Sequence, residues 1–316
     1  MSDILTEIFP LEVIELIFLF MTERPLKILY ENLPANSTLR LMARSRLLKP
    51  VSVRELGELM RLAKLDTPIG KLDLPGKTEL LLFLKDNPSF VTGISHVHID
   101  DHDWDESKYS ILKEIQFSSY SLEAALLYHF DPSQVPLTLT LLTLQFIYEP
   151  TRKRIGGWPS SLTSLSIYNH QSVYLIELPL TLKVLSCSGV NRVWHKFPPK
   201  LEGLYFSDTC WITSHDFEFP KSLRTLCTMY CDIPDVQKIL DKLPGSLKEL
   251  EFRRNEGSDF SSLEFPNSIE YLSLAESDID SLDGYVFPKS LKELLLVDTK
   301  VPRDKFHYLP GVDVII

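Results

Sequence analysis

The chain has few glycines, few cysteines and no excess of basic residues. Among its 316 residues there are 12 glycines and 4 cysteines, and the net charge at pH 7 is -10. This acidic balance argues against a general binder of nucleic acid or of anionic membranes, which needs a basic face. The cysteines, at positions 187, 210, 227 and 231, contain no C-x-x-C pair. We therefore expect reduced thiols in a cytoplasmic or nuclear protein, with no disulfide framework and no zinc site.

A long hydrophobic run is also missing. The apolar stretch VIELIFLFM at 13–21 is too short to cross a bilayer. A signal peptide needs basic residues before its apolar segment, whereas this stretch follows Asp3, Glu7 and Glu12. We expect no targeting segment and no membrane partner.

One phrase recurs eight times in the second half of the chain, as in FPKSLKELLL at 287–296. Each copy reads P-x-x-L-x-x-L-x-h, where h is mostly apolar. Alternation in the second half of the phrase predicts a strand, and one such strand cannot bury its apolar face without stacked neighbours. Proline fixes φ and restricts the residue before it, so we expect an extended run that turns into the strand. The prolines are 19 to 24 residues apart: Pro136, Pro159, Pro179, Pro198, Pro220, Pro244, Pro266 and Pro288.

This period and the L-x-x-L-x-L core resemble leucine-rich repeats, whose period is roughly 20–29 residues. The proline-containing form is similar to the short repeats of bacterial effectors and of amoebal FNIP proteins. The resemblance implies an α/β solenoid, a right-handed superhelix with a parallel concave sheet, over residues 51–316. At these lengths we expect little room for a convex helix. The exception is the longest spacing, where one or two helical turns fit in PDVQKILDKLP at 234–244.

Upstream of residue 135 the apolar frame continues without the prolines. We interpret IGKLDL (69–74), ISHVHI (94–99) and ILKEIQF (111–117) as degenerate repeat units that supply strands. Between them, KTELLLFLKDN (77–87) is typical of a helix. A further helix is predicted over 52–64, opened by a capping box of Ser52 and Glu55.

The N-terminus carries a second signature, FPLEVIELIFLFM at 9–21, which resembles the opening of an F-box. The resemblance covers roughly residues 5–50 and implies a small helical domain at 1–50 that binds the Skp adaptor; the Trp usual near its end is absent. An alternative interpretation is a helical cap on the solenoid. The residues that the resemblance assigns to adaptor binding are Phe9, Pro10, Glu12, Val13, Ile17 and Phe18.

Together the two resemblances imply the substrate-recognition subunit of an SCF-type (Skp–cullin–F-box) ubiquitin ligase. Such a subunit is not itself an enzyme and needs no cofactor. A repeat scaffold with no ubiquitin role is the alternative. A third alternative is a hydrolase. The segment HVHIDDHDWD at 96–105 resembles the H-x-H-x-D-H metal motif but has one additional Asp. The segment GKLDLPGKT at 70–78 resembles a phosphate-binding loop but has one additional residue between its glycines. We expect no metal site.

A target protein is expected to bind the outward residues of the sheet. The third, fifth and seventh places of each L-x-x-L-x-L unit face outward, because strand side chains alternate. Aromatic and Arg side chains are the usual anchors of such an interface, and the glutamates add negative charge toward the C-terminal end. We expect apolar or aromatic target side chains near Tyr205 and Met229, and a basic one near Glu249 and Glu251. The predicted target-binding residues are Tyr168, Tyr205, Met229, Glu249, Glu251, Arg253 and Tyr271.

Overall fold

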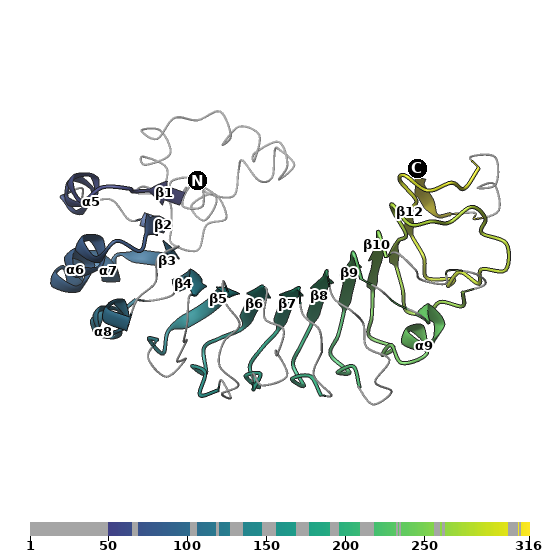
Figure 1. The fold of residues 1–316 in the computed structure, drawn as a ribbon, viewed down its shortest axis with the longest axis horizontal. Coiled ribbons are helices and arrows are strands. Elements are labelled where there is room, and N and C mark those ends of the chain that lie inside the picture. The colour runs from purple at the N-terminus through teal and green to yellow at the C-terminus, as the bar shows by residue number, and fades with distance from the viewer. Residues whose placement is uncertain are drawn as a thin grey trace, which may run out of the picture. The chain divides into compact units, whose positions relative to one another are not determined.

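The computed structural model divides into two compact units (Figure 1). The first comprises residues 1–101 and 105–122, and the second 102–104 and 123–316. The F-box-like segment lies almost wholly outside the described residues. Those residues are 50–64, 69–101, 106–117, 120–126, 135–146, 156–168, 177–189, 196–208, 218–231, 233, 235–255, 260, 263–302, 309 and 311–316.

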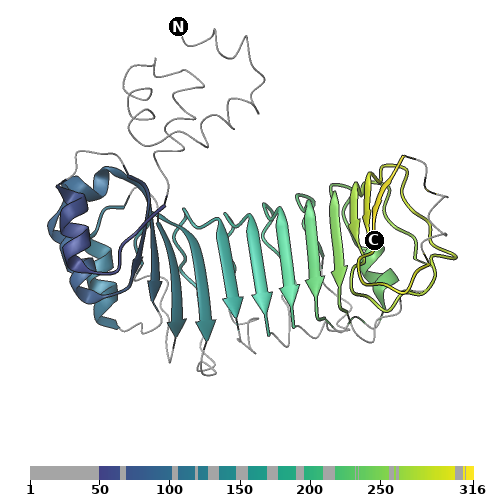
Figure 2. The same ribbon diagram turned by 90° about the horizontal axis from the view of Figure 1, so that it is seen from above.

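In the first unit, parallel strands alternate with helices. Strand β1 pairs with β2 and β2 with β3, and the helices lie together on one side of these strands (Figure 2). The apolar residues of β2 and β3 predicted to face the core are buried, and both segments form the strands that the sequence predicted. The elements are β1 (Pro50–Ser52), α5 (Leu56–Ala63), β2 (Ile69–Pro75), α6 (Thr78–Asp86), α7 (Pro88–Thr92), β3 (Ile94–Asp101), α8 (Glu106–Glu114) and the first three residues of β4 (Tyr120–Leu126), whose other residues belong to the second unit.

Two local predictions for this unit are wrong. The segment 111–117 is not a strand: it contains the end of α8, and the strand β4 begins only at Tyr120. Ile111 and Leu112 are buried in the last turn of the helix, and Ile115, directly after its end, is buried as well. Helix α5 is also capped differently, by Glu55 in a capping box with Glu58, since pairing with β2 draws Ser52 into β1.

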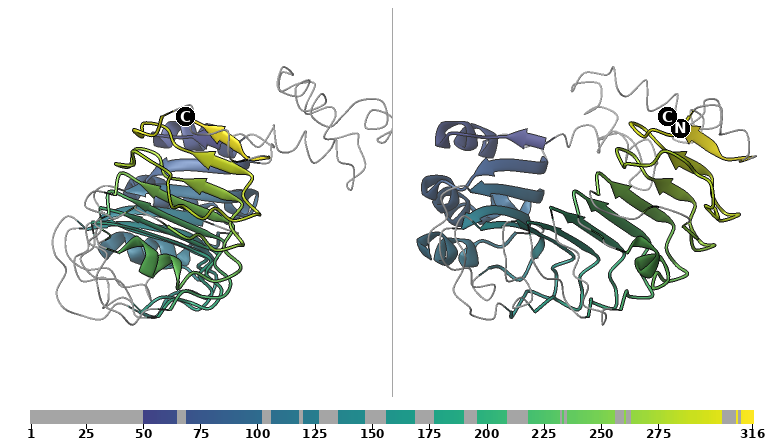
Figure 3. Two further views of the ribbon diagram at one scale, coloured as in Figure 1. Left: turned by 90° about the vertical axis from the view of Figure 1, so that its right-hand side faces the viewer. Right: turned by 45° about the vertical axis from the view of Figure 1, so that its right-hand side comes forward.

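In the second unit, nine strands pair in parallel in the order of the chain, side by side along a curved stack (Figure 3). The leucines of successive units are in register, as in Leu204, Leu226 and Leu250, and all three are fully buried. The predicted leucine-rich-repeat solenoid is confirmed. The elements are β5 (Leu139–Phe146), β6 (Ser164–Tyr168), β7 (Val184–Ser188), β8 (Gly203–Ser207), β9 (Thr225–Met229), α9 (Val236–Leu240), β10 (Glu249–Arg253), β11 (Tyr271–Ser273), β12 (Glu293–Leu295) and β13 (Asp313–Ile315).

The proline opens a tight turn in each of the eight copies. Its carbonyl oxygen accepts a hydrogen bond from the N–H of the leucine or isoleucine three residues on, at N···O distances of 3.0–3.2 Å. This is the hydrogen bond of a β-turn, which leads the chain directly into the strand. The helix α9 lies in the longest spacing, as the sequence predicted.

A hydroxyl in the same turn fastens five of the eight units to the one before it. Ser222 Oγ donates to the carbonyl oxygens of Pro199 and Leu201, at 2.8 and 2.7 Å. Such a bond satisfies carbonyls that the strand ladder does not reach. It gives a role to the Ser or Thr that precedes the first leucine in these copies, whereas one copy has Lys200 there and the hydroxyls of Thr138 and Ser268 have no hydrogen-bond partner among the described residues. The same donation to the preceding unit is made by Ser161, Thr181, Ser246 and Ser290.

Each strand from β7 to β12 is followed closely by a residue with positive φ. These residues lie ten positions after the proline, with φ between 46° and 66°. Glycine adopts this conformation freely, but only the first of the series is a glycine, so the others keep a side chain at a conformational cost. The series is Gly189, Asp208, Tyr230, Arg254, Glu276 and Asp298.

Candidate functional site

The outward face of the second unit brings together most of the predicted target-binding residues. The register places Tyr205 beside Cys227 and then Glu251, while Met229 lies beside Arg253, and Glu249 beside Tyr271. Six of the seven predicted residues therefore occupy four neighbouring strands, β8 to β11. Tyr168 stands apart on β6, two strands away from Tyr205.

The Tyr205 side chain extends back along its own strand, over Gly203. A Cβ atom added at Gly203 would come within 3.0 Å of Tyr205 Cε2, so the glycine provides the room that the ring occupies. The residue remains 37% exposed. Burial, and then the nearby Glu249 carboxylate, raises the pKa of the Tyr205 hydroxyl. Tyr205 thus presents an aromatic surface, and its hydroxyl stays protonated at neutral pH.

The carboxylates beside this ring are held in place by neighbouring side chains. Thr225 Oγ1 donates to Glu249 Oε2 at 2.9 Å. Glu251 Oε2 lies 3.0 Å from Arg253 Nε and accepts a longer hydrogen bond from Cys227 Sγ at 3.8 Å. Two negative groups therefore lie next to an exposed ring, and one of them is already paired with a guanidinium.

Two outward positions are covered by their neighbours. Cys227 is only 9% exposed, and burial, followed by the charge of Glu251, raises the pKa of its thiol to about 12. A thiol with this pKa is not a nucleophile at neutral pH. Ser273 is fully buried, and its hydroxyl has no hydrogen-bond partner among the described residues.

The outward face changes character along the second unit. Toward β5 and β7 it exposes the apolar side chains Leu141 and Val184. Toward β12 and β13 the corresponding positions are Glu293 and Asp313. A partner that crosses the strands therefore meets an apolar end and an acidic end.

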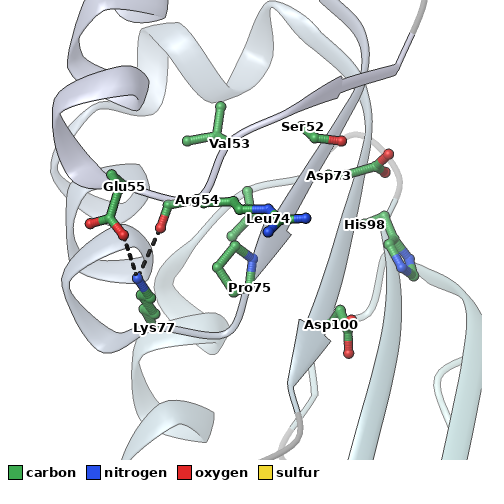
Figure 4. Close-up of a pocket in the computed structure, with 10 residues that line it drawn as sticks. All are labelled: Ser52, Val53, Arg54, Glu55, Asp73, Leu74, Pro75, Lys77, His98 and Asp100. Carbon is green, nitrogen blue, oxygen red and sulfur yellow. Dashed lines mark hydrogen bonds and ion pairs between the residues drawn. The ribbon is translucent and has the colours of Figure 1, made fainter.

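A separate pocket of about 460 Å³ lies in the first unit (Figure 4). Lys77 Nζ, at its rim, donates to the Arg54 carbonyl oxygen and to Glu55 Oε1, both at 3.0 Å. Both signs of charge line the pocket, which gives no clear preference for one ligand class. The lining residues are Ser52, Val53, Arg54, Glu55, Asp73, Leu74, Pro75, Lys77, His98 and Asp100.

The histidines of the near-match to a metal motif share one buried hydroxyl. Ser121 Oγ lies 3.0 Å from His96 Nε2 and 2.8 Å from His98 Nδ1. Burial, and then the charge of Lys71, lowers the pKa of His96. Ser121 is 3% exposed, so a substrate carbonyl cannot reach its oxygen. Within the described ranges, no group of three His, Cys, Asp or Glu residues is placed to hold a metal ion.

The additional aspartate of this motif has a packing role. Asp101 pairs with Lys108 at 2.8 Å, and both side chains are less than 10% exposed. Asp101 also lies directly over Gly76, where an added Cβ would come within 2.4 Å of it. The aspartate that breaks the metal motif thus fastens β3 to α8.

The predicted adaptor-binding residues, Phe9 to Phe18, lie outside the described residues. Among the helices that the structure does describe, none has both the length and the apolar character needed to span a bilayer.

Comparison with known proteins supports the repeat fold. No protein-family model and no curated protein matches the chain. The solved structures that resemble it include TLR13 in complex with ssRNA13, at 15% identity and a TM-score of 0.54, over 84% of this chain and 45% of TLR13. An internalin (InlF) from Listeria monocytogenes has 17% identity and a TM-score of 0.47, over 96% of this chain and 93% of the internalin. The chain thus spans less than half of TLR13. At these identities the likeness to TLR13 concerns the fold alone, which is that of a leucine-rich-repeat solenoid.

Proposed function

We propose that this chain recognises a target protein on the outward face of β6 to β11 and presents it to an SCF-type ubiquitin ligase. Target recognition is supported by the cluster of side chains on the outward face of β8 to β11. There an exposed ring, two carboxylates and a guanidinium are held in fixed positions on one surface. Solenoids commonly bind partners on this face, and Tyr and Arg are frequent anchors of interfaces. The anchors of the target would be Tyr168, Tyr205, Met229, Glu249, Glu251, Arg253 and Tyr271.

The second half of the proposal rests on the F-box-like sequence. Residues 1–50 would hold the Skp adaptor through Phe9, Pro10, Glu12, Val13, Ile17 and Phe18, and residues 51–316 would hold the target. The chain would act in the cytoplasm or nucleus without catalytic residues of its own, because ubiquitin transfer belongs to other subunits.

A repeat scaffold without a ubiquitin role is the alternative. An RNA partner, such as the one bound to TLR13, is disfavoured because Glu249, Glu251 and Glu293 would repel phosphates. The ubiquitin-ligase hypothesis and the scaffold hypothesis predict the same target-binding face, and they differ only in the role of residues 1–50.

Proximity labelling followed by paired substitutions tests the target-binding face. Tyr205→Ala and Glu251→Lys should weaken binding of the labelled partner without changing the thermal unfolding of the chain. A partner that binds both variants as tightly as the wild type would disprove the assignment of this face.

Co-purification with the Skp adaptor tests the ubiquitin role. Wild-type chain should retain the adaptor, whereas a variant with Pro10→Ser and Ile17→Gln should lose it while its repeat domain stays folded. Absence of adaptor binding in the wild type would leave the scaffold alternative.

A further inference from the structure

The aromatic face of Tyr205 is open to a partner side chain, and a carboxylate lies at its hydroxyl end. The ring lies over Gly203, which has no side chain to lift it from the sheet. Thr225 lies beside Gly203 on the next strand and donates to the Glu249 carboxylate, one strand further, at 2.9 Å. The carboxylate thus belongs to the row of residues that the hydroxyl end of Tyr205 reaches, and exposed aromatic surface and negative charge lie close together.

We propose that Tyr205 and Glu249 form a recognition site for one arginine side chain of the target, with the guanidinium stacked on the ring and its N–H groups donated to the carboxylate. Glu251, already paired with Arg253, adds negative charge beside this site. The inference rests on the proposed target-binding function and specifies the partner's chemistry.

The chain contains a related arrangement within itself. Arg254 Cζ lies 5.4 Å from the centre of the Tyr230 ring, and the guanidinium donates to the Tyr230 hydroxyl and pairs with Glu276. A guanidinium between a tyrosine ring and a carboxylate is thus a stable arrangement in this protein. At Tyr205 the ring and carboxylate are present on the outward face, and an arginine from a partner would complete the set.

Arginine suits this site better than lysine. Its planar guanidinium stacks on an aromatic face and still directs N–H donors within its plane toward a carboxylate at the edge of the ring. The lysine ammonium is a compact, strongly hydrated charge that gains less from the ring.

Fluorescein-labelled hexapeptides of arginine, lysine or citrulline provide the probes, with binding to the full chain followed by fluorescence anisotropy. We expect the arginine peptide to bind about two- to fivefold more tightly than the lysine peptide, the gain of one exposed cation–π contact. The citrulline peptide, which has the same shape without the charge, should show no saturable binding.

Matched variants separate the site from general electrostatic attraction. Tyr205→Leu should abolish the preference for arginine, and Tyr205→Phe, which keeps the ring, should retain it. Glu249→Gln should weaken the arginine peptide by about threefold. Glu79→Gln makes the same charge change at an exposed position on α6 and should leave binding nearly unchanged. Thermal unfolding of each variant confirms that the fold is kept.

Three outcomes overturn the inference: no preference for arginine in the wild type, a preference that survives Tyr205→Leu, or equal weakening by Glu79→Gln and Glu249→Gln. Failure of the proposed function gives a different result, since a labelled partner would then bind the Tyr205→Ala variant normally. A partner that needs the face but contains no required arginine would disprove this inference alone.

Discussion

Each of the two units builds a parallel sheet, but their return paths differ. The register step from β1 to β2 is 21 residues, from Pro50 to Lys71, and it includes the eight-residue helix α5. The step from β11 to β12 is 22 residues, from Tyr271 to Glu293, and the structure describes every residue of it without a helix. Repeat length therefore does not decide whether a helix forms, contrary to the expectation that short units leave little room for one.

The two units also differ in how the chain enters each strand. In the second unit a proline opens the turn before each of the eight strands that it precedes, and it lacks the N–H that a helix interior requires. In the first unit the corresponding segments carry helical apolar spacing, as in Leu80, Leu81 and Leu84 of α6, all of which are fully buried. The first unit is thus held by helix packing, and the second by turns and their hydroxyl bonds.

The largest effect should come from breaking the buried ion pair of the first unit. Asp101→Ala leaves Lys108 charged and buried, which should lower the free energy of unfolding by about 3–5 kcal/mol. Urea denaturation measures the change. The matched control in the second unit is Asp278→Ala, which removes an exposed partner of Lys300 and should cost at most about 1 kcal/mol. Equal effects of the two substitutions would show that the burial of Asp101 is not energetically important.

A core truncation should affect the second unit almost as strongly. Leu250 is fully buried, so Leu250→Ala should lower the free energy of unfolding by about 2–5 kcal/mol. The adjacent outward substitution Glu249→Ala should change it by less than about 0.5 kcal/mol. If denaturant unfolding shows Leu250→Ala to be silent, the repeat register is incorrect.

Removal of a turn hydroxyl should have a smaller effect that is specific to the second unit. Ser222→Ala deletes the donor to the Pro199 and Leu201 carbonyls and should destabilise the unit by about 0.5–1.5 kcal/mol. Its exposed neighbour provides the control, since Lys221→Ala should have little effect on the same unfolding curve. A cost as small as that of the control would contradict the fastening role of the hydroxyl.

The smallest effect should be a pH dependence confined to the first unit. Because the pKa of His96 is lowered on folding, the unfolded chain binds more protons just below the unfolded value of 6.5. The contribution of His96 to the free energy of unfolding is therefore fully present above pH 6.5 and is lost as the pH decreases below it. Thermal unfolding between neutral and mildly acidic pH should show this slope, and His96→Gln should reduce it. An unchanged slope in the variant would assign the dependence to other groups.

Most of the repeat frame could be predicted from the sequence, because the signals are local. Alternation in LKVLSC predicted the burial of Leu185 and Cys187, and the proline before it marked the turn. The segment 111–117 was mispredicted since Leu112, Ile115 and Phe117 fit the repeat spacing, although Leu112 belongs to a helix. Short apolar runs fit a strand and a buried helix face equally well.

The sequence by itself determined the solenoid, its period and which residues of each strand face outward, because side-chain direction alternates along a strand whatever lies beside it. Only the tertiary structure decided which outward side chains remain accessible. Tyr205 and Cys227 occupy the same outward row of neighbouring strands, yet the first is exposed and the second is covered. The neighbours that cover a residue come from strands about 4.8 Å away in space but some twenty residues distant in the chain, beyond the reach of any local pattern. For the same reason, the structure placed the Glu249 carboxylate beside the Tyr205 ring, where the proposed arginine site lies.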